Sequence, residues 1–334
     1  MTKPSVSIAG ILADLRCGRD LSRASAGDLA RALLGGHCAD NDVRDALVGL
    51  YQKGESVSEI LGFIDVMRAN MTPVSVTVRP IMDSCGTGGS GIDNRFNVST
   101  AAAFVLGAMG YYVVKHGNRG SRFANGSIDF LDALGVPYAL SDDEHNDRLQ
   151  KKGVTFLFAR LYHTAVRHVA PIRQQLSHRS IFNIIGPFCN PASPSIQIVG
   201  TPSEAMAQRL YAVGESLSYD TFAVVTGESG LDDCSTVGRS RIWVRQGQST
   251  RAMVVDPLDW GIRHTLSDIT VGGASLSADN AAVFRDIRHR QDTQHPIAVL
   301  IAFNVAVMAH IMDPHTAIDA AYASAQAALV TLTL

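Results

Sequence analysis

A short segment between Asp83 and Asp129 gathers residue types that bind phosphate groups. It begins with the glycine-rich turn of residues 86–91, which reads GTGGSG. Glycine lets a backbone approach a ligand closely, and successive peptide N–H groups can form an anion-binding nest. The turn alone is equally well explained by the geometry of a tight strand-to-helix connection. The features that follow it favour the phosphate interpretation.

Those features are the start of a helix and the end of a strand. The helix is expected to open within Asn97-Val98-Ser99-Thr100, where its N-terminus adds partial positive charge. Lys115 and Arg119 lie at the end of an apolar strand and supply full positive charges. Two anion sites this close together indicate a ligand with two separated phosphate groups.

Two adjacent carboxylates, Asp232 and Asp233, follow another apolar strand. Neighbouring carboxylates repel each other unless solvent or a cation compensates. Oxygen ligands of this kind suit Mg²⁺, which commonly takes one or two carboxylates together with phosphate oxygens. A bare pair is more often a solvated acidic turn, but next to a phosphate site we interpret it as a magnesium site.

Arg173 is expected just inside the start of a helix in the segment APIRQQL, residues 170–176. Its guanidinium can hold a carboxylate through two hydrogen bonds, although a surface arginine is the commoner case. Arg179 is expected on the opposite side of the same helix, in a structural role. His116 falls in the loop around Lys115 and can line an acceptor pocket. No Ser/His/Asp triad is recognisable, which disfavours covalent catalysis.

The composition predicts a globular protein. The chain has 334 residues, of which 46% are apolar and 18% charged, and a net charge of −2. That is ample for a buried core, and the near-neutral charge favours neither nucleic-acid nor membrane binding. The most apolar run, 297–312, includes Asn304 and predicts a buried helix. The N-terminal apolar stretch is too short for a signal peptide or a membrane span.

Five scattered cysteines without a CxxC pair predict neither zinc binding nor a disulfide framework. We expect Cys85, Cys189 and Cys234 to be small buried side chains and the protein to be cytoplasmic.

The hydrophobic periodicity divides the chain into two regions. Residues 1–72 predict helices only, and a helical segment near 168–190 is expected to join them. Residues 73–334 predict an α/β domain with a mainly parallel sheet. The expected strands are 76–82, 111–114, 154–158, 196–199, 222–225, 242–244 and 252–255; the chief helices are 99–109, 127–134 and 203–218. Because ligands bind beyond the carboxyl ends of such strands, we expect the glycine-rich turn and Lys115 to lie side by side.

Taken together, these motifs resemble the anthranilate phosphoribosyltransferase family. The resemblance covers most of the chain and is carried by CGTGG, FNVSTAAAFVLGAMG, VVKHGNR, GSIDFLDALGV, FLFARLYHTAVRHVAPIR, RSIFNIIGPFCNPA and GLDD. It implies a nucleoside phosphorylase/phosphoribosyltransferase-like fold of the thymidine phosphorylase type and a homodimer through the helical domain. It also implies Mg²⁺-dependent transfer of 5-phosphoribose from phosphoribosyl pyrophosphate to the amine of anthranilate, in tryptophan biosynthesis.

The resemblance assigns roles to individual residues. The donor would be bound by Gly86, Gly89, Ser90, Asn97, Ser99, Thr100, Lys115, Asn118, Arg119 and Ser127. The acceptor would contact Gly86, His116, Asn118 and Arg173, and Mg²⁺ would be held by Ser99, Asp232 and Asp233. No residue is assigned to proton transfer, because an aromatic amine is already neutral and nucleophilic at neutral pH.

The chain departs from the family pattern on the donor and metal side. Ser90 replaces an aspartate, Arg95 stands where threonine is typical, Ala124 replaces a lysine and Asp233 replaces a glutamate. The loop of residues 92–95 is one residue longer. Two alternatives therefore stay open. One is a paralogue that phosphoribosylates another aromatic acceptor, and the other is an inactive member that serves as a binding protein.

Overall fold

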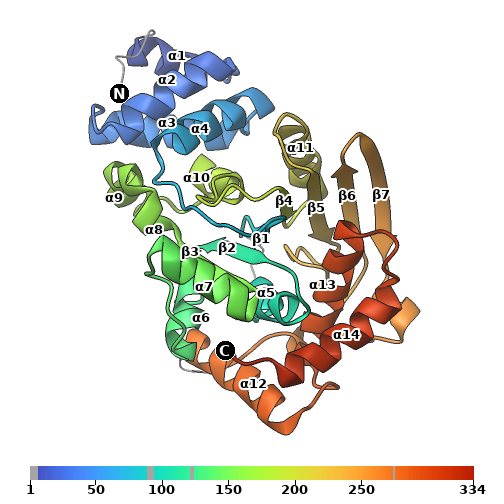
Figure 1. Cartoon of the computed structure of the whole chain (residues 1–334). Coiled ribbons are helices and arrows are strands. Elements are labelled where there is room, and N and C mark those ends of the chain that lie inside the picture. The colour runs from blue at the N-terminus through green and yellow to red at the C-terminus, as the bar shows by residue number, and fades with distance from the viewer. Residues whose placement is uncertain (1–6, 89–93, 121–123, 274) are drawn as a thin grey trace. The chain divides into compact units, whose positions relative to one another are not determined.

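The computed structural model describes every residue except 1–6, 89–93, 121–123 and 274 (Figure 1). The chain forms two compact units. The helical unit comprises Met1–Pro73 and Arg160–Pro191, and the α/β unit comprises Val74–Ala159 and Ala192–Leu334. The sequence placed the boundary at residue 72 and expected the returning helical segment near 168–190.

The helical unit is built from short amphipathic helices. Its first part contains α1 (Ile8–Arg16), α2 (Arg23–Leu34), α3 (Asp40–Lys53) and α4 (Val57–Asn70). The returning segment contains α8 (Ala159–Tyr162), α9 (Ala170–Gln174) and α10 (Ile181–Ile185), with the 3-10 helices η1 (Thr164–His168) and η2 (Gly186–Phe188). Ser56 caps α4 by accepting a hydrogen bond from the N–H of Glu59, whose carboxylate bonds back to Ser56.

The α/β unit contains a seven-stranded sheet in the order β3-β2-β1-β4-β5-β6-β7. The first five strands are parallel: β1 (Met82–Gly86), β2 (Val113–Gly117), β3 (Val154–Phe158), β4 (Ile196–Gly200) and β5 (Thr221–Gly227). The antiparallel strands β6 (Ser240–Gln246) and β7 (Ser249–Val255) extend one edge. The expectation of a mainly parallel sheet is confirmed.

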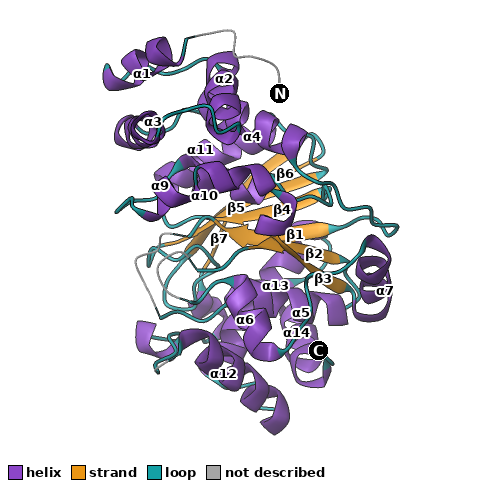
Figure 2. Ribbon diagram, turned by 90° about the vertical axis from the view of Figure 1, so that its left-hand side faces the viewer, coloured by secondary structure: helices purple, strands orange, loops and turns teal. Residues whose placement is uncertain are grey.

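Helices cover both faces of this sheet, which explains why its central strands are largely buried (Figure 2). The unit contains α5 (Val98–Ala108), α6 (Ser127–Leu134), α7 (Asp142–Lys152), α11 (Glu204–Glu215), α12 (Leu276–Arg290), α13 (Pro296–Met312) and α14 (Ile318–Thr331), with η3 (Pro257–Trp260) and η4 (Leu266–Asp268). Helix α11 lies on one face, and α5 and α13 lie on the other (Figure 2). Helix α13 is buried along almost its whole length, as predicted. Within the described residues, no helix is both long and apolar enough to span a bilayer.

Two predicted strands are misplaced. The first was expected at residues 76–82, but β1 begins only at Met82, because Pro80 lacks an N–H for the ladder. The preceding N–H groups of Ser75 and Thr77 instead donate to side chains of α7, at 3.1 and 2.7 Å. The second strand runs to Gly117 rather than ending at residue 114.

Asn304 links the buried helix α13 to the loop after β5. Its side chain accepts a 2.9 Å hydrogen bond from the N–H of Cys234 and donates to the Cys234 and Leu300 carbonyls, both at 2.9 Å. Asn304→Ala is expected to lower the free energy of unfolding by about 2–3 kcal/mol, because it leaves buried backbone groups without their hydrogen-bond partner. Urea denaturation measures this loss.

The matched control is Ser324→Ala, since that exposed hydroxyl bonds only to the Ala320 carbonyl of its own helix. Its effect should stay within about 0.5 kcal/mol. Equal losses in the two variants would contradict a specific role for Asn304.

Candidate functional site

The site begins where two neighbouring strands end in glycine. Gly86 ends β1 and pairs in register with Gly200, which ends β4. A methyl group on Gly200 would collide with the main-chain oxygen of Asp232, and one on Gly86 would collide with its carboxylate. The missing side chains therefore create the space into which the loop after β5 folds. As a result, Asp232 lies directly against the glycine-rich turn.

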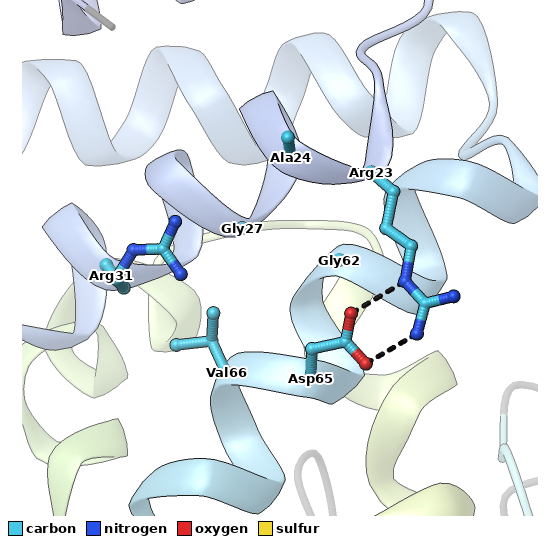
Figure 3. A pocket seen from close by; sticks show the side chains of 7 residues that line it. All are labelled: Arg23, Ala24, Gly27, Arg31, Gly62, Asp65 and Val66. Carbon is cyan, nitrogen blue, oxygen red and sulfur yellow. Dashed lines mark hydrogen bonds and ion pairs between the residues drawn. The ribbon is translucent and has the colours of Figure 1, made fainter. Parts of the chain in front are cut away.

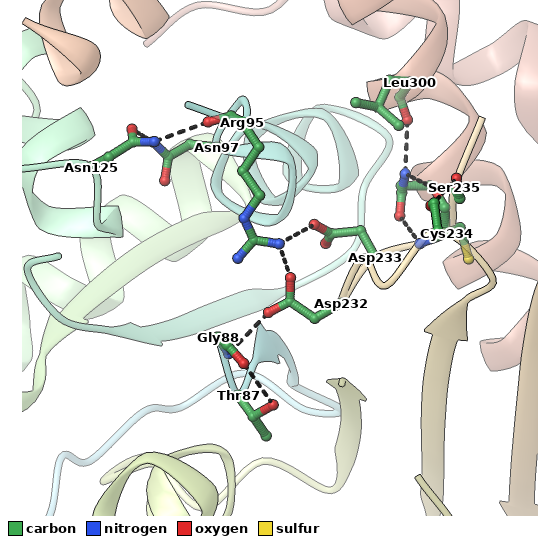
Figure 4. Close-up of polar contacts among 12 residues, drawn as sticks. Thr87, Gly88, Arg95, Asn97, Asn125, Asp232, Asp233, Cys234, Ser235 and Leu300 are labelled. Carbon is green, nitrogen blue, oxygen red and sulfur yellow. Dashed lines mark hydrogen bonds and ion pairs between the residues drawn. The ribbon is translucent and has the colours of Figure 1, made fainter. Parts of the chain in front are cut away.

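The Asp232 carboxylate is almost fully buried, at 3% exposure, and both of its oxygens are engaged. One accepts a 2.9 Å hydrogen bond from the N–H of Gly88, whose φ of +71° suits glycine. The other accepts from the guanidinium of Arg95, which also lies 3.9 Å from Asp233 (Figure 4). The predicted pair of carboxylates thus lies beside the predicted phosphate-binding turn.

Burial raises the pKa of Asp233, and the positive charges of Arg95 and Lys115 oppose that shift. Burial also raises the pKa of Cys189 to about 12 and that of Cys234 well above its ordinary value. These two thiols are neutral and buried, as predicted. Cys85 is only half-buried, although desolvation again raises its thiol pKa.

The start of α5 is connected to this pair of carboxylates through Arg95, which lies two residues before the N-cap residue Asn97 (Figure 4). Helix α5 begins at Val98, and the side chain of Asn97 makes no capping hydrogen bond. That side chain donates to Asn125 at 2.7 Å, and Asn125 donates to the Arg95 carbonyl at 2.9 Å. The loop before α5 and the loop before α6 are therefore tied together.

The first turn of α5 also carries two hydroxyl groups that the sequence singled out. The Thr100 hydroxyl is buried and has no hydrogen-bond partner among the described residues. Ser99, one residue earlier, is half-buried. A buried hydroxyl at a helix N-terminus fits contact with an anionic ligand, which would satisfy its hydrogen-bonding capacity.

Lys115 and His116 lie within β2, so the prediction that His116 belongs to a loop is wrong. Lys115 is 1% exposed and donates to the carbonyl of Ser84 in the neighbouring strand. The N–H of His116 donates to the buried carboxylate of Asp83 at 3.3 Å. The strand continues three residues beyond its expected end at residue 114, because these polar groups find partners on β1.

Arg119 is paired within the protein. Its guanidinium contacts Asp129 at 2.8 Å and Asp132 at 2.6 Å, both on α6. Asp129 also accepts from the N–H groups of Gly120 and Gly126, at 2.8 and 2.9 Å. The predicted cation therefore stabilises the loop that joins β2 to α6, and its charge is balanced there.

Asn118 and Ser127 lie at the two ends of the same loop. Asn118 is exposed, and its side chain accepts a 2.9 Å hydrogen bond from the N–H of Arg119. Ser127 is the first residue of α6, and its side chain approaches Gly117 so closely that a methyl group there would lie 2.7 Å from the Ser127 Cβ. The other predicted donor residues, Gly89 and Ser90, lie outside the described residues.

Arg173 belongs to the helical unit, unlike the other predicted site residues. Its guanidinium carbon lies 5.0 Å from the centre of the Phe182 ring, and its Nε is buried without a hydrogen-bond partner in the described part of the chain. Burial, and secondarily the charge of Arg160, lowers the pKa of Arg173 to about 10. The side chain thus remains cationic at neutral pH and retains capacity for an anion.

Arg179 has the structural role that the sequence predicted, but it lies beyond the end of α9 rather than on that helix. Both of its terminal nitrogens contact the buried carboxylate of Glu55 at 3.1 Å.

Two hollows differ greatly in size. A void of about 10 Å³ lies beneath the loop at Asp233 and has room for one water at most. An open pocket of about 350 Å³ lies between α2 and α4 in the helical unit (Figure 3). It is lined by Arg23, Ala24, Gly27, Arg31, Gly62, Asp65 and Val66, with Arg23 and Asp65 joined by hydrogen bonds of 2.7 and 2.8 Å. None of the predicted site residues lines it.

Sequence reasoning missed three residues that organise the site: Arg95, Asn125 and Asn304. Arg95 was noted only as a departure from a family pattern, and its partner lies 137 positions away. No local spacing identifies contacts of that range.

Comparison with known proteins gives a consistent result. Residues 78–331 match the glycosyl transferase family, a/b domain, and residues 9–71 match the glycosyl transferase family, helical bundle domain. The anthranilate phosphoribosyltransferase of Azotobacter vinelandii is 35% identical, over 93% of this chain and 89% of that protein.

Solved structures agree in fold. The crystal structure of anthranilate phosphoribosyltransferase from Thermus thermophilus superposes with a TM-score of 0.84 at 31% identity, covering 96% of this chain and 94% of that one. The enzyme of Saccharomyces cerevisiae, in complex with phosphoribosyl pyrophosphate and magnesium, has the same TM-score at 24% identity, over 96% and 93% of the two chains.

The two glycines at the strand ends should respond differently to substitution. Gly200→Ala places a methyl group against the backbone of residue 232, so we expect a loss of about 3 kcal/mol or more in unfolding free energy. Gly86→Ala displaces mainly a side chain, and we expect near-normal folding with weakened binding of inorganic pyrophosphate and Mg²⁺. Urea denaturation and calorimetry measure the two effects.

Gly272→Ala is the control, because a methyl group there meets nothing within 4 Å. If Gly86→Ala bound pyrophosphate as tightly as Gly272→Ala, the close approach at Gly86 would have no bearing on the ligand.

Proposed function

This chain belongs to the anthranilate phosphoribosyltransferase family, and we propose that it transfers 5-phosphoribose from phosphoribosyl pyrophosphate to the amine of anthranilate. The observation that carries this proposal is the placement of Asp232 against the glycine-rich turn, with both carboxylates of the pair next to Arg95, which lies three residues before the start of α5. Carboxylates and an anion-binding helix start in one place suit a metal-bound diphosphate.

The donor set fits Mg²⁺ as part of a complex with the substrate. In the described parts of the chain, no three His, Cys, Asp or Glu side chains are grouped so as to hold a metal ion by themselves. Mg²⁺ usually keeps several waters and combines one or two carboxylates with substrate phosphate oxygens. Asp232 and Asp233, with Ser99, would hold the ion in this way once Arg95 releases Asp232. The ion would neutralise charge on the pyrophosphate as it leaves.

The reaction breaks the bond between C1 of the ribose and the pyrophosphate oxygen, which keeps the electron pair. The amine lone pair of anthranilate forms the new bond to C1, and its proton passes to solvent. Negative charge therefore grows on the pyrophosphate, where the hydroxyl of Thr100 and the N-terminal turn of α5 would stabilise it. Because the aromatic amine is already neutral, it needs no base to activate it. The main task of the protein at the acceptor is to orient the amine toward C1 of the ribose.

Arg173 would bind the acceptor carboxylate. This role is supported by its buried Nε, which has no partner among the described residues, and by a pKa of about 10 that keeps it charged at neutral pH. Hydrogen bonds between a guanidinium and a carboxylate are strong and directional. The family resemblance also gives acceptor roles to Gly86, His116 and Asn118.

A homodimer through the helical unit and a cytoplasmic location complete the proposal, and both rest on the family resemblance. Light scattering of the purified protein would test the dimer, since one chain has a mass of 35.7 kDa.

Loss of anthranilate fluorescence is the decisive assay. We expect it only when phosphoribosyl pyrophosphate and Mg²⁺ are both present, with release of one pyrophosphate per acceptor consumed. Other aromatic amines serve as parallel substrates. Turnover of one of them but not of anthranilate would identify a paralogue with another acceptor. Absence of turnover with all of them would leave the inactive binding protein as the better account.

Arg173→Ala should raise the KM for anthranilate by about 10- to 100-fold, equivalent to the 1.5–3 kcal/mol of a charged hydrogen bond. The KM for the donor should change little. Initial rates at varied concentrations of each substrate measure the two constants. The control is Arg167→Ala, which removes an exposed arginine from η1. An equal rise in both KM values would show that Arg173 does not act on the acceptor carboxylate.

A further inference from the structure

Arg95 occupies the position at which the carboxylate pair meets the glycine-rich turn. Its guanidinium bonds to Asp232 and lies 3.9 Å from Asp233, and its side chain is only 25% exposed (Figure 4). The Gly88 N–H engages the other oxygen of Asp232. In this arrangement the carboxylate that the proposed function gives to Mg²⁺ is already neutralised by the protein.

The position of Arg95 is built into the fold. Its carbonyl accepts a 2.9 Å hydrogen bond from Asn125, and its backbone forms a β-bridge with Thr270. The carbonyl of Asn94 accepts a 2.7 Å hydrogen bond from the N–H of Val271. Two separate segments therefore anchor this part of the chain, and the guanidinium reaches Asp232 from a defined place.

A guanidinium stays protonated at all physiological pH values, so this internal cation is permanent. A divalent ion and the guanidinium compete for the same oxygens, because both carry positive charge and repel each other at short range. A pyrophosphate group changes the balance, since it offers phosphate oxygens to which the guanidinium can bind in a bidentate manner.

We propose that Arg95 makes metal binding depend on the donor. Without a diphosphate, Arg95 holds Asp232 and excludes the divalent ion. When the diphosphate arrives, the guanidinium transfers to its oxygens, and the two carboxylates become available to one metal ion. This inference rests on the proposed function and gives Arg95 direct contact with the phosphate oxygens of the donor.

The test is calorimetric titration of Mg²⁺ into the full-length protein, first without and then with inorganic pyrophosphate. In Arg95→Thr and Arg95→Gln, the affinity for Mg²⁺ alone should rise about tenfold or more, because the competing charge is gone. Arg95→Lys should retain the wild-type behaviour in large part. At saturating Mg²⁺, both neutral variants should bind pyrophosphate about tenfold more weakly, since one cation is lost.

Arg263→Thr controls for the loss of one positive charge, because that exposed arginine lies elsewhere in the same unit. The glutamine variant keeps the bulk and a hydrogen bond to Asp232, so it tests the charge if the threonine variant folds poorly. Equal Mg²⁺ affinity without pyrophosphate in the wild type and the glutamine variant would overturn the inference. If the wild type still consumed anthranilate in the fluorescence assay, the proposed function would stand.

Discussion

The site depends on one close approach: residue 232 packs against the ends of two adjacent strands that both finish in glycine. Gly86 and Gly200 are register partners, and neither has room for a side chain. This packing brings a loop from after β5 to the turn after β1, across the strand between them. Asn304 holds the far side of the same loop through both polar groups of Cys234. Fixing the loop from both sides therefore positions the carboxylates.

The second constraint is charge balance in a partly buried site. Asp232 bonds to Arg95, the charges of Arg95 and Lys115 act on Asp233, and Asp83 accepts a hydrogen bond from the N–H of His116. Each carboxylate is stabilised by backbone N–H groups or by a fixed cation, which lowers the cost of burying it. In the proposed function, a diphosphate with a divalent ion would exchange charges in this network. Such preorganisation suits a reaction whose main electrostatic change occurs on a leaving group.

Local patterns predicted much of this fold, because helices and buried strands each have a characteristic spacing of apolar residues along the sequence. The helical residues before Pro73, the mainly parallel sheet and the buried helix α13 follow from periodicity alone. The ends of β1 and β2 were predicted at the wrong residues, since the end of a strand depends on which neighbouring strand supplies its hydrogen-bond partners. The partners of Arg119 on α6 were not apparent either, although they decide whether its charge is available. The contact between Arg95 and Asp232 joins residues 137 positions apart, and only the topology explains it.

The departures from the family pattern make physical sense when they are taken together. Ala124 removes a positive charge that the pattern places there, and Arg95 introduces one where threonine is typical. Asn125, the neighbour of Ala124, donates its side-chain hydrogen bond to the carbonyl of Arg95, so the two changes lie on either side of one contact. Relative to that pattern, the chain lacks a cation at position 124 and carries one at Arg95, where it contacts Asp232 and lies 3.9 Å from Asp233. In the proposal made above, this cation would compete with a metal ion for Asp232, and that competition would couple donor binding to metal binding.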